Sequence, residues 1–118
     1  MFKSILSRIP ERGGDVLGLA LVSLDGIAIE KVSVDPRFNF DTLIAEFTDR
    51  MKKIIQSSAD MGTGSAQEMV VFTDRAVVIL RNVHEDYYIL CAARPDGMHG
   101  RVRHAIRMAI PELAQELA

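Results

Sequence analysis

The sequence is short of several residue types, and each shortage excludes a class of protein. Its 118 residues include one cysteine, Cys91, so no internal disulfide framework can form, and a reducing compartment such as the cytoplasm fits. Tryptophan is absent and aromatic residues reach only 6%, which argues against a surface that stacks on nucleic-acid bases. The net charge of −2 supplies no basic field for nucleic acid either.

Long apolar runs are also missing. No window approaches the roughly 18 uninterrupted apolar residues that span a membrane, and residues 1–14 lack the apolar core of a signal peptide. Lys3 and Arg8 are too few to anchor the N-terminal segment on a membrane surface. The length suits one domain over residues 1–118, and we expect no membrane insertion and no nucleic-acid partner.

What the sequence does contain is a regular succession of helix-like and strand-like segments. The apolar spacing over residues 2–9 predicts a short helix, which Pro10 and the pair Gly13-Gly14 are expected to end. A second and longer helix is predicted over residues 41–61. Each of these helices is amphipathic, so each must dock on something to be stable in water.

The ends of the later helices carry their own signals. Asn39 or Asp41 is expected to cap the start of the long helix, and Gly62 to end it. A last helix is predicted over residues 97–118, where apolar residues keep helical spacing. Pro111 lies well inside it and predicts a kink or a restart.

Five strands lie between the helices, and their polarity predicts the order of the sheet. Short links join the first strand to the second, and the third to the fourth and fifth, so the sheet is antiparallel. The first, fourth and fifth strands are nearly continuous apolar runs and belong in the centre, whereas the other two carry charges and suit the edges. Counted along the chain, the predicted order is 2-1-5-4-3, for strands at 16–24, 27–34, 67–73, 76–83 and 87–94.

The predicted fold class is therefore α+β, an α/β sandwich. A five-stranded antiparallel sheet carries the long helix on one face and the N- and C-terminal helices on the other.

The pair Asp25-Gly26 interrupts two apolar runs and raises the question of a catalytic acid. A two-residue Asp-Gly link is a strong hairpin signal, because both residues accept positive φ. No partner acid, base or metal ligand lies near Asp25 in the sequence. We interpret it as a turn residue.

Other signs of chemistry are equally weak. His84, His99 and His104 do not fall at metal-ligand spacing, and no serine or cysteine has a readable base partner. The glycine-rich stretch 61–67 follows a helix and lacks the lysine of a phosphate-binding loop. The sequence therefore predicts a protein that is not an enzyme, with no catalytic residue, cofactor or metal.

Two helix faces are candidates for binding. On the long helix, the charged row Glu46, Asp49, Arg50 and Lys53 lies apart from an apolar face formed by Leu43, Phe47, Met51, Ile54 and Ser58, which Ile44 and Ile55 widen. The last helix has a basic face formed by Arg101, Arg103, His104 and Arg107. Each charged set is either a solvated face or a surface for a partner protein.

The order of these elements resembles the Roadblock / dynein light chain family. The family's first hairpin is an apolar strand that ends in Asp-Gly, which residues 17–26 match. Its last helix often opens with a glycine followed by basic residues at helical spacing, and "MHGRVRHAIRMAI" at 98–110 is similar. The resemblance covers nearly the whole chain.

The resemblance implies a dimer without chemistry of its own. Family dimers join through the third strand and lay their second helices side by side. The implied interface comprises Met51, Ile55, Glu68, Met69, Val70, Val71 and Phe72. In bacteria such proteins resemble the regulator of a Ras-like motility GTPase, and in eukaryotes they are dynein light chains or scaffolds.

We therefore expect a homodimer that binds and regulates a small Ras-like GTPase through Glu46, Asp49, Arg50 and Lys53. One form of this regulation is the role of a GTPase-activating co-regulator. The alternatives are a scaffold without effect on GTP turnover and a small-molecule sensor.

Overall fold

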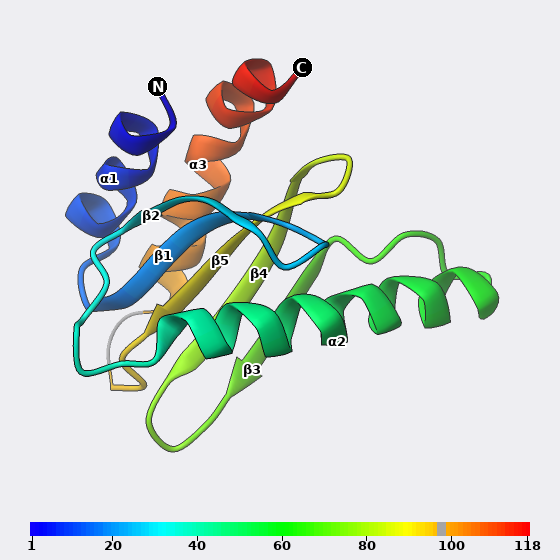
Figure 1. Ribbon diagram of the computed structural model, residues 1–118, viewed down its shortest axis with the longest axis horizontal. Helices are drawn as coiled ribbons and strands as arrows, with labels where there is room; N and C mark the ends of the chain where they lie inside the picture. Colours follow the sequence, from blue (N-terminus) through cyan, green and yellow to red (C-terminus); the bar gives the residue numbers. More distant parts are fainter. Residues whose placement is uncertain (97–98) are drawn as a thin grey trace.

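Helices cover both faces of one antiparallel sheet in this chain (Figure 1). The computed structural model describes residues 1–96 and 99–118. The predicted α+β fold class is confirmed. In chain order the elements are α1 (Phe2–Gly13), β1 (Val16–Ser23), β2 (Ala28–Val32), α2 (Phe40–Asp60), β3 (Glu68–Phe72), β4 (Val77–His84), β5 (Tyr87–Ala93) and α3 (His99–Leu117).

The strand order is β2-β1-β5-β4-β3, and every pairing is antiparallel, as predicted. The polarity of the strands, from which this order was predicted, also explains it. Strands β1, β5 and β4 are buried along most of their length, whereas β2 and β3 are only partly buried and lie at the two edges. An edge strand has solvent on one side and tolerates charge there.

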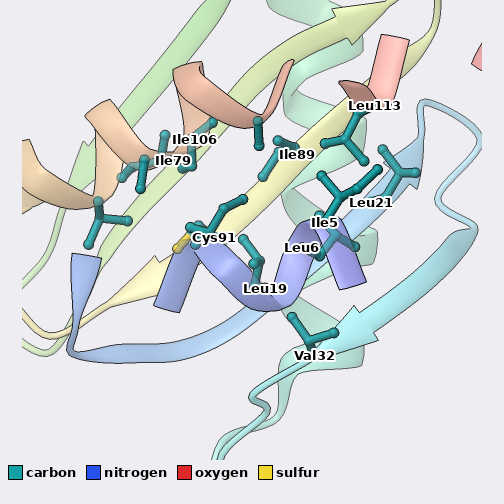
Figure 2. Packing of buried hydrophobic residues seen from close by; sticks show 14 of the residues in the cluster. Ile5, Leu6, Leu19, Leu21, Val32, Ile79, Ile89, Cys91, Ile106 and Leu113 are labelled. Carbon is teal, nitrogen blue, oxygen red and sulfur yellow. The ribbon is translucent and has the colours of Figure 1, made fainter. Parts of the chain in front are cut away.

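The sheet separates two apolar cores, because successive side chains of a strand point to opposite faces. One core lies between the sheet and the helices α1 and α3, and Figure 2 shows ten of its labelled residues there, from Ile5 to Leu113. The other lies between the sheet and α2. Neighbouring residues of β5 therefore belong to different cores: Tyr87 packs against the first and Tyr88 is buried in the second.

Helices α1 and α3 lie side by side on one face of the sheet (Figure 1). Gly13 allows the close approach, because a Cβ at this position would lie 2.9 Å from Val102 of α3. The expectation that Pro10 ends the first helix is wrong. Proline removes only one helical hydrogen bond, and the burial of Ile9 and Gly13 on either side holds the turn in place.

Pro111 likewise does not interrupt α3, which runs as one helix. The fully buried Leu113 holds its last turns on the core. The predicted start of this helix, at Gly97, lies outside the described residues, and so does Met98.

Helix α2 begins and ends as its sequence indicates. The side chain of Asn39 accepts a hydrogen bond from the Thr42 amide at 3.2 Å, so Asn39 rather than Asp41 is the cap. At the other end Gly62 has φ of 76°, and its amide donates to the carbonyl of Ala59 at 3.1 Å. The amide of Thr63 reaches the Ser58 carbonyl at 2.9 Å, which completes a Schellman motif.

The buried face of α2 differs from the prediction. The buried residues are Phe40, Ile44, Thr48 and Met51, whereas Ile54 is 46% exposed. All four lie in the first twelve residues of the helix, and the rest of α2 extends past the sheet (Figure 1). The apolar face of α2 therefore continues beyond the part of the helix that packs on the sheet.

The link at Asp25-Gly26 is longer than a two-residue hairpin. Residues 24–27 separate β1 from β2, and the Gly26 amide donates to the Ser23 carbonyl at 3.0 Å. Within residues 24–27, only Gly26 has positive φ, at 86°. A three-to-four-residue link of this kind needs one left-handed residue after the turn, which glycine supplies. Asp25 is exposed at this corner, as expected of a turn residue.

Candidate functional site

Strand β3 is an open edge with apolar side chains. It pairs with β4 on one side only, from Glu68 with Arg81 to Phe72 with Val77. Met69 and Val70 pack against opposite cores, and Val71 is half-buried. Phe72 is 62% exposed. An apolar edge of this length presents free backbone groups beside apolar surface, which is a template for pairing with another strand.

The C-terminal half of α2 adds a second apolar surface. Ile54 and Met61 are 46% and 71% exposed, and Ile55 is half-buried against the α2 core. Met51, which we expected at a dimer interface, is fully buried inside the chain. The structure thus offers Ile54 and Ile55 of this helix and Met61, its C-cap, to a partner, and keeps Met51 in the core.

The charged row of α2 lies on the exposed side of the helix and pairs within itself. Arg50 donates to the carboxylate of Glu46 at 2.6 Å and to its backbone carbonyl at 3.0 Å. Lys53 lies 3.1 Å from the Asp49 carboxylate. Both pairs have the i, i+4 spacing read from the sequence, and all four side chains are more than half exposed. Exposed pairs of this kind contribute about 0.3–0.5 kcal/mol each.

A link between β3 and α3 was not predicted from the sequence. Glu68, an acid in an apolar strand, accepts a short hydrogen bond from Arg103. The Nε of Arg103 is buried without an acceptor among the described residues. One turn earlier, the His99 ring meets the Phe72 ring edge-on, with centroids 5.0 Å apart. The basic face predicted on the last helix is therefore wrong for Arg103, which lies against the sheet.

The sequence contains only part of the information needed to predict the pair between Glu68 and Arg103. A lone acid among apolar strand residues calls for a basic partner, but several arginines qualify, and Arg103 is 35 residues away in sequence. Arg101, His104 and Arg107 are exposed, as predicted.

The groups that could do chemistry are few in the described part of the chain. Cys91 is fully buried, and burial raises the pKa of its thiol to about 12. A thiol with that pKa stays protonated at neutral pH and is a poor nucleophile. Burial also raises the pKa of Tyr88, whose hydroxyl donates to the Ala66 carbonyl at 3.3 Å.

Residues 1–96 and 99–118 contain no group of three or more His, Cys, Asp or Glu side chains placed to hold a metal ion. Within the same ranges, no helix is long and apolar enough to cross a membrane.

The described residues thus offer two open apolar surfaces, on β3 and on α2, and comparison with known proteins identifies the fold that presents them. No family model matches the chain, and no curated protein matches it by sequence. Solved structures match closely. A Roadblock/LC7 domain from Streptomyces avermitilis superposes with a TM-score of 0.85 at 16% identity, covering 97% of this chain and 95% of that one. The chain has the Roadblock/LC7 fold.

Two MglB proteins share the Roadblock/LC7 fold with this chain. MglB of Myxococcus xanthus superposes with a TM-score of 0.85 at 14% identity, covering 98% of this chain and 96% of that one. The gliding protein MglB of Thermus thermophilus gives 0.82 at 15% identity, covering 97% and 88%. The resemblance drawn from the sequence is confirmed in the fold, and at such low identities the likeness does not extend to individual residues.

Proposed function

We propose that this chain is a non-enzymatic, cytoplasmic binding module that forms a homodimer and regulates a small Ras-like GTPase. One Roadblock-like domain, residues 1–118, carries both the self-association surface and the GTPase surface. The observation that carries the proposal is the pairing of two open apolar surfaces, strand β3 and the free half of α2, in a fold shared with MglB.

The dimer surface combines backbone and side-chain complementarity. Strand β3 of one copy would pair with β3 of the other, so that two sheets join across a two-fold axis. The same axis would bring the exposed halves of the two α2 helices together. The surface is made of Ile55, Glu68, Met69, Val70, Val71 and Phe72, with Ile54 added from the structure and Met51 supporting the helix from within.

The GTPase surface is the charged row Glu46, Asp49, Arg50 and Lys53, doubled by the two-fold axis. Mixed charges at an interface affect the association rate and specificity more than affinity. No arginine is assigned as a finger that reaches the γ-phosphate. If GTP turnover rises on binding, the module repositions the catalytic residues of the GTPase itself.

Two alternatives use the same fold. A scaffold would bind partners without a preference for the nucleotide state. A small-molecule sensor would need an enclosed pocket with convergent polar groups. A hollow of about 530 Å³ lies at the loop between β2 and α2, where Lys31 and Asp41 are already paired at 2.9 Å. A ligand there would have to compete with that pair.

Light scattering at micromolar concentration tests self-association. The wild-type chain should have the mass of a dimer, and Phe72→Ser should weaken the dimer by at least about tenfold, because the most exposed aromatic side chain of the proposed interface is lost. Ile27→Ser is the matched control, since Ile27 is 63% exposed beside the opposite edge strand, β2. A monomeric wild type, or equal effects of the two substitutions, would refute the proposed dimer.

The GTPase proposal is tested by binding. Ras-like GTPases of the same organism would be loaded with a GTP analogue or with GDP, and the affinities compared by calorimetry. We expect tighter binding of the GTP form and a larger loss with Arg50→Glu than with Arg50→Ala, because charge reversal adds repulsion to Glu46 and to the partner.

Single-turnover hydrolysis then separates regulation from scaffolding. Equal affinity for the two nucleotide states would leave only the scaffold, because a ligand without differential affinity shifts no equilibrium. Absence of binding in both nucleotide states would reject the tested GTPase as a partner of this chain.

A further inference from the structure

A groove lies between α1 and α3, on the face of the sheet opposite α2. Its cavity measures about 180 Å³. The floor is apolar and the rim is charged, with a lining of Ile5, Arg8, Ile9, Arg12, Ala105, Met108, Ala109 and Glu112. The hollow exists because α3 presents the short side chains of Ala105 and Ala109 where α1 passes. Both alanines are almost fully buried, and they form part of the floor of the hollow.

The rim has a basic end. Arg8 is already paired with Glu112, through two hydrogen bonds of 3.0 and 2.8 Å. Arg12, one turn further along α1, forms no ion pair or hydrogen bond from its side chain within residues 1–96 and 99–118. Gly13 packs close to Val102, so Arg12 lies at the end of the groove where α1 ends and α3 begins. This end is positive and faces solvent.

The charge of the helix pair differs from that of the rest of the chain. Helices α1 and α3 together hold six Lys and Arg and three Asp and Glu, a net charge of +3. The whole chain carries −2, so the remainder carries −5. Arg103 is paired with Glu68 of the sheet, so this face keeps an excess of +2 (three minus one), and it attracts negatively charged partners.

We propose that the groove between α1 and α3 binds an acidic segment of a partner protein, which inserts one bulky apolar side chain over Ala105 and Ala109 and places a carboxylate on Arg12. The site lies on the opposite face of the sheet from the proposed GTPase surface. It can therefore be occupied independently of that surface.

The size of the groove selects this occupant over a small molecule. Sites for drug-sized ligands measure roughly 300–1,000 Å³, whereas 180 Å³ holds about one side chain. Recognition of a peptide by one apolar anchor and flanking charges is a common mode.

The structure also disfavours a membrane surface. The apolar stripe of α1, which includes Ile5, Leu6 and Ile9, is buried against the sheet and is not available to lipid.

The probe is a set of fluorescein-labelled peptides of about 12 residues, in which Glu and Asp flank a central Leu, Met or Phe. Fluorescence anisotropy measures binding to the full chain, and amide shifts in NMR spectra locate it. We expect shifts in α1 and α3, and affinity that falls about tenfold between roughly 50 and 300 mM salt. Peptides with Lys in place of the acids, or Ser in place of the central residue, should bind at least about tenfold more weakly.

Three variants predict in which direction the peptide affinity should change. Arg12→Glu should weaken binding of the acidic peptide by about tenfold or more, because it places repulsion at the basic end. Glu112→Gln should strengthen binding, since it frees Arg8 and removes a competing carboxylate. Lys53→Glu makes the same charge change as Arg12→Glu on the other face and should leave peptide binding unchanged.

The outcomes separate this proposal from the proposed function. Lys53→Glu alters GTPase binding in that proposal, whereas Arg12→Glu does not. Failure of every acidic peptide to bind, shifts confined to α2 and β3, or equal binding by Arg12→Glu would each overturn the groove proposal. Sedimentation of the chain with phosphatidylserine vesicles, lost in Arg12→Glu, would assign the basic end to a membrane instead and would also overturn it.

Discussion

At the scale of single residues, the absence of a side chain shapes this fold as much as any contact. Gly18 lies in the buried strand β1, and the Phe40 ring at the start of α2 rests against it. A Cβ on Gly18 would lie 2.8 Å from the nearest ring carbon. The glycine thus provides the space in which the first turn of α2 seats on the sheet.

Gly18→Ala should therefore destabilise the protein by about 1–3 kcal/mol, since the added methyl group overpacks a filled core. Urea unfolding followed by circular dichroism measures the free energy. Gly100→Ala is the matched control: no atom lies within 4 Å of its added Cβ, and it should gain up to about 1 kcal/mol from helix propensity. Equal stability of Gly18→Ala and wild type would contradict the packing described for Phe40.

Asp35 gives a prediction that depends on pH. Its carboxylate accepts hydrogen bonds from the Arg37 side chain and backbone amide, which hold its pKa below the ordinary value of 3.8. A lowered carboxylate pKa stabilises the folded state above 3.8, and this stabilisation is lost as the pH falls through the lower, folded pKa.

Asp35→Asn should consequently lower the melting temperature at about pH 7, and the difference from wild type should vanish in acid below pH 3.8. Thermal melts across this range measure it. If the difference in melting temperature persisted undiminished at acid pH, the effect of Asp35 would come from the backbone geometry of the loop between β2 and α2, and not from its charge.

At the scale of elements, the sequence predicted the strands and their order, because the central strands are apolar throughout and the edge strands are not. Amide exchange followed by mass spectrometry should find β1, β5 and β4 the slowest segments, since their opening requires global unfolding. The edge strand β2 should exchange faster. Fast exchange over Tyr87–Ala93 with slow exchange over Ala28–Val32 would contradict the sheet order.

The errors at this scale have physical causes. Apolar spacing in α2 cannot show where the sheet beneath it ends, so Ile54 was placed on the packed face although it lies beyond the sheet. Pro10 predicts the end of a helix and Pro111 a kink or a restart, but each helix continues through its proline, because burial of the neighbouring residues outweighs one lost hydrogen bond at each position. The pair Glu68 and Arg103 depends on a contact between distant elements, which local patterns do not encode.

At the scale of the whole molecule, the proposed dimer links folding to concentration. The half of α2 beyond the sheet has few contacts within the chain, so a partner copy would supply what stabilises it. If two copies unfold together, the melting temperature rises by about 2–5 °C for each tenfold rise in protein concentration. Calorimetric scans at several concentrations measure this.

Phe72→Ser should abolish that dependence, while Ile27→Ser keeps it. A wild-type melting temperature that does not change with concentration would contradict a dimer coupled to folding.

The alternation of side chains along β5 also equips the protein with two optical probes. The chain has two tyrosines and no tryptophan, so Tyr87 and Tyr88 account for its near-ultraviolet emission. Tyr87 packs on the α1 and α3 side, and Tyr88 on the α2 side. Replacing either by phenylalanine would leave a chain whose remaining emission reports on one face of the sheet. A ligand of the groove and a partner of α2 could then be distinguished in the same cuvette without any attached dye.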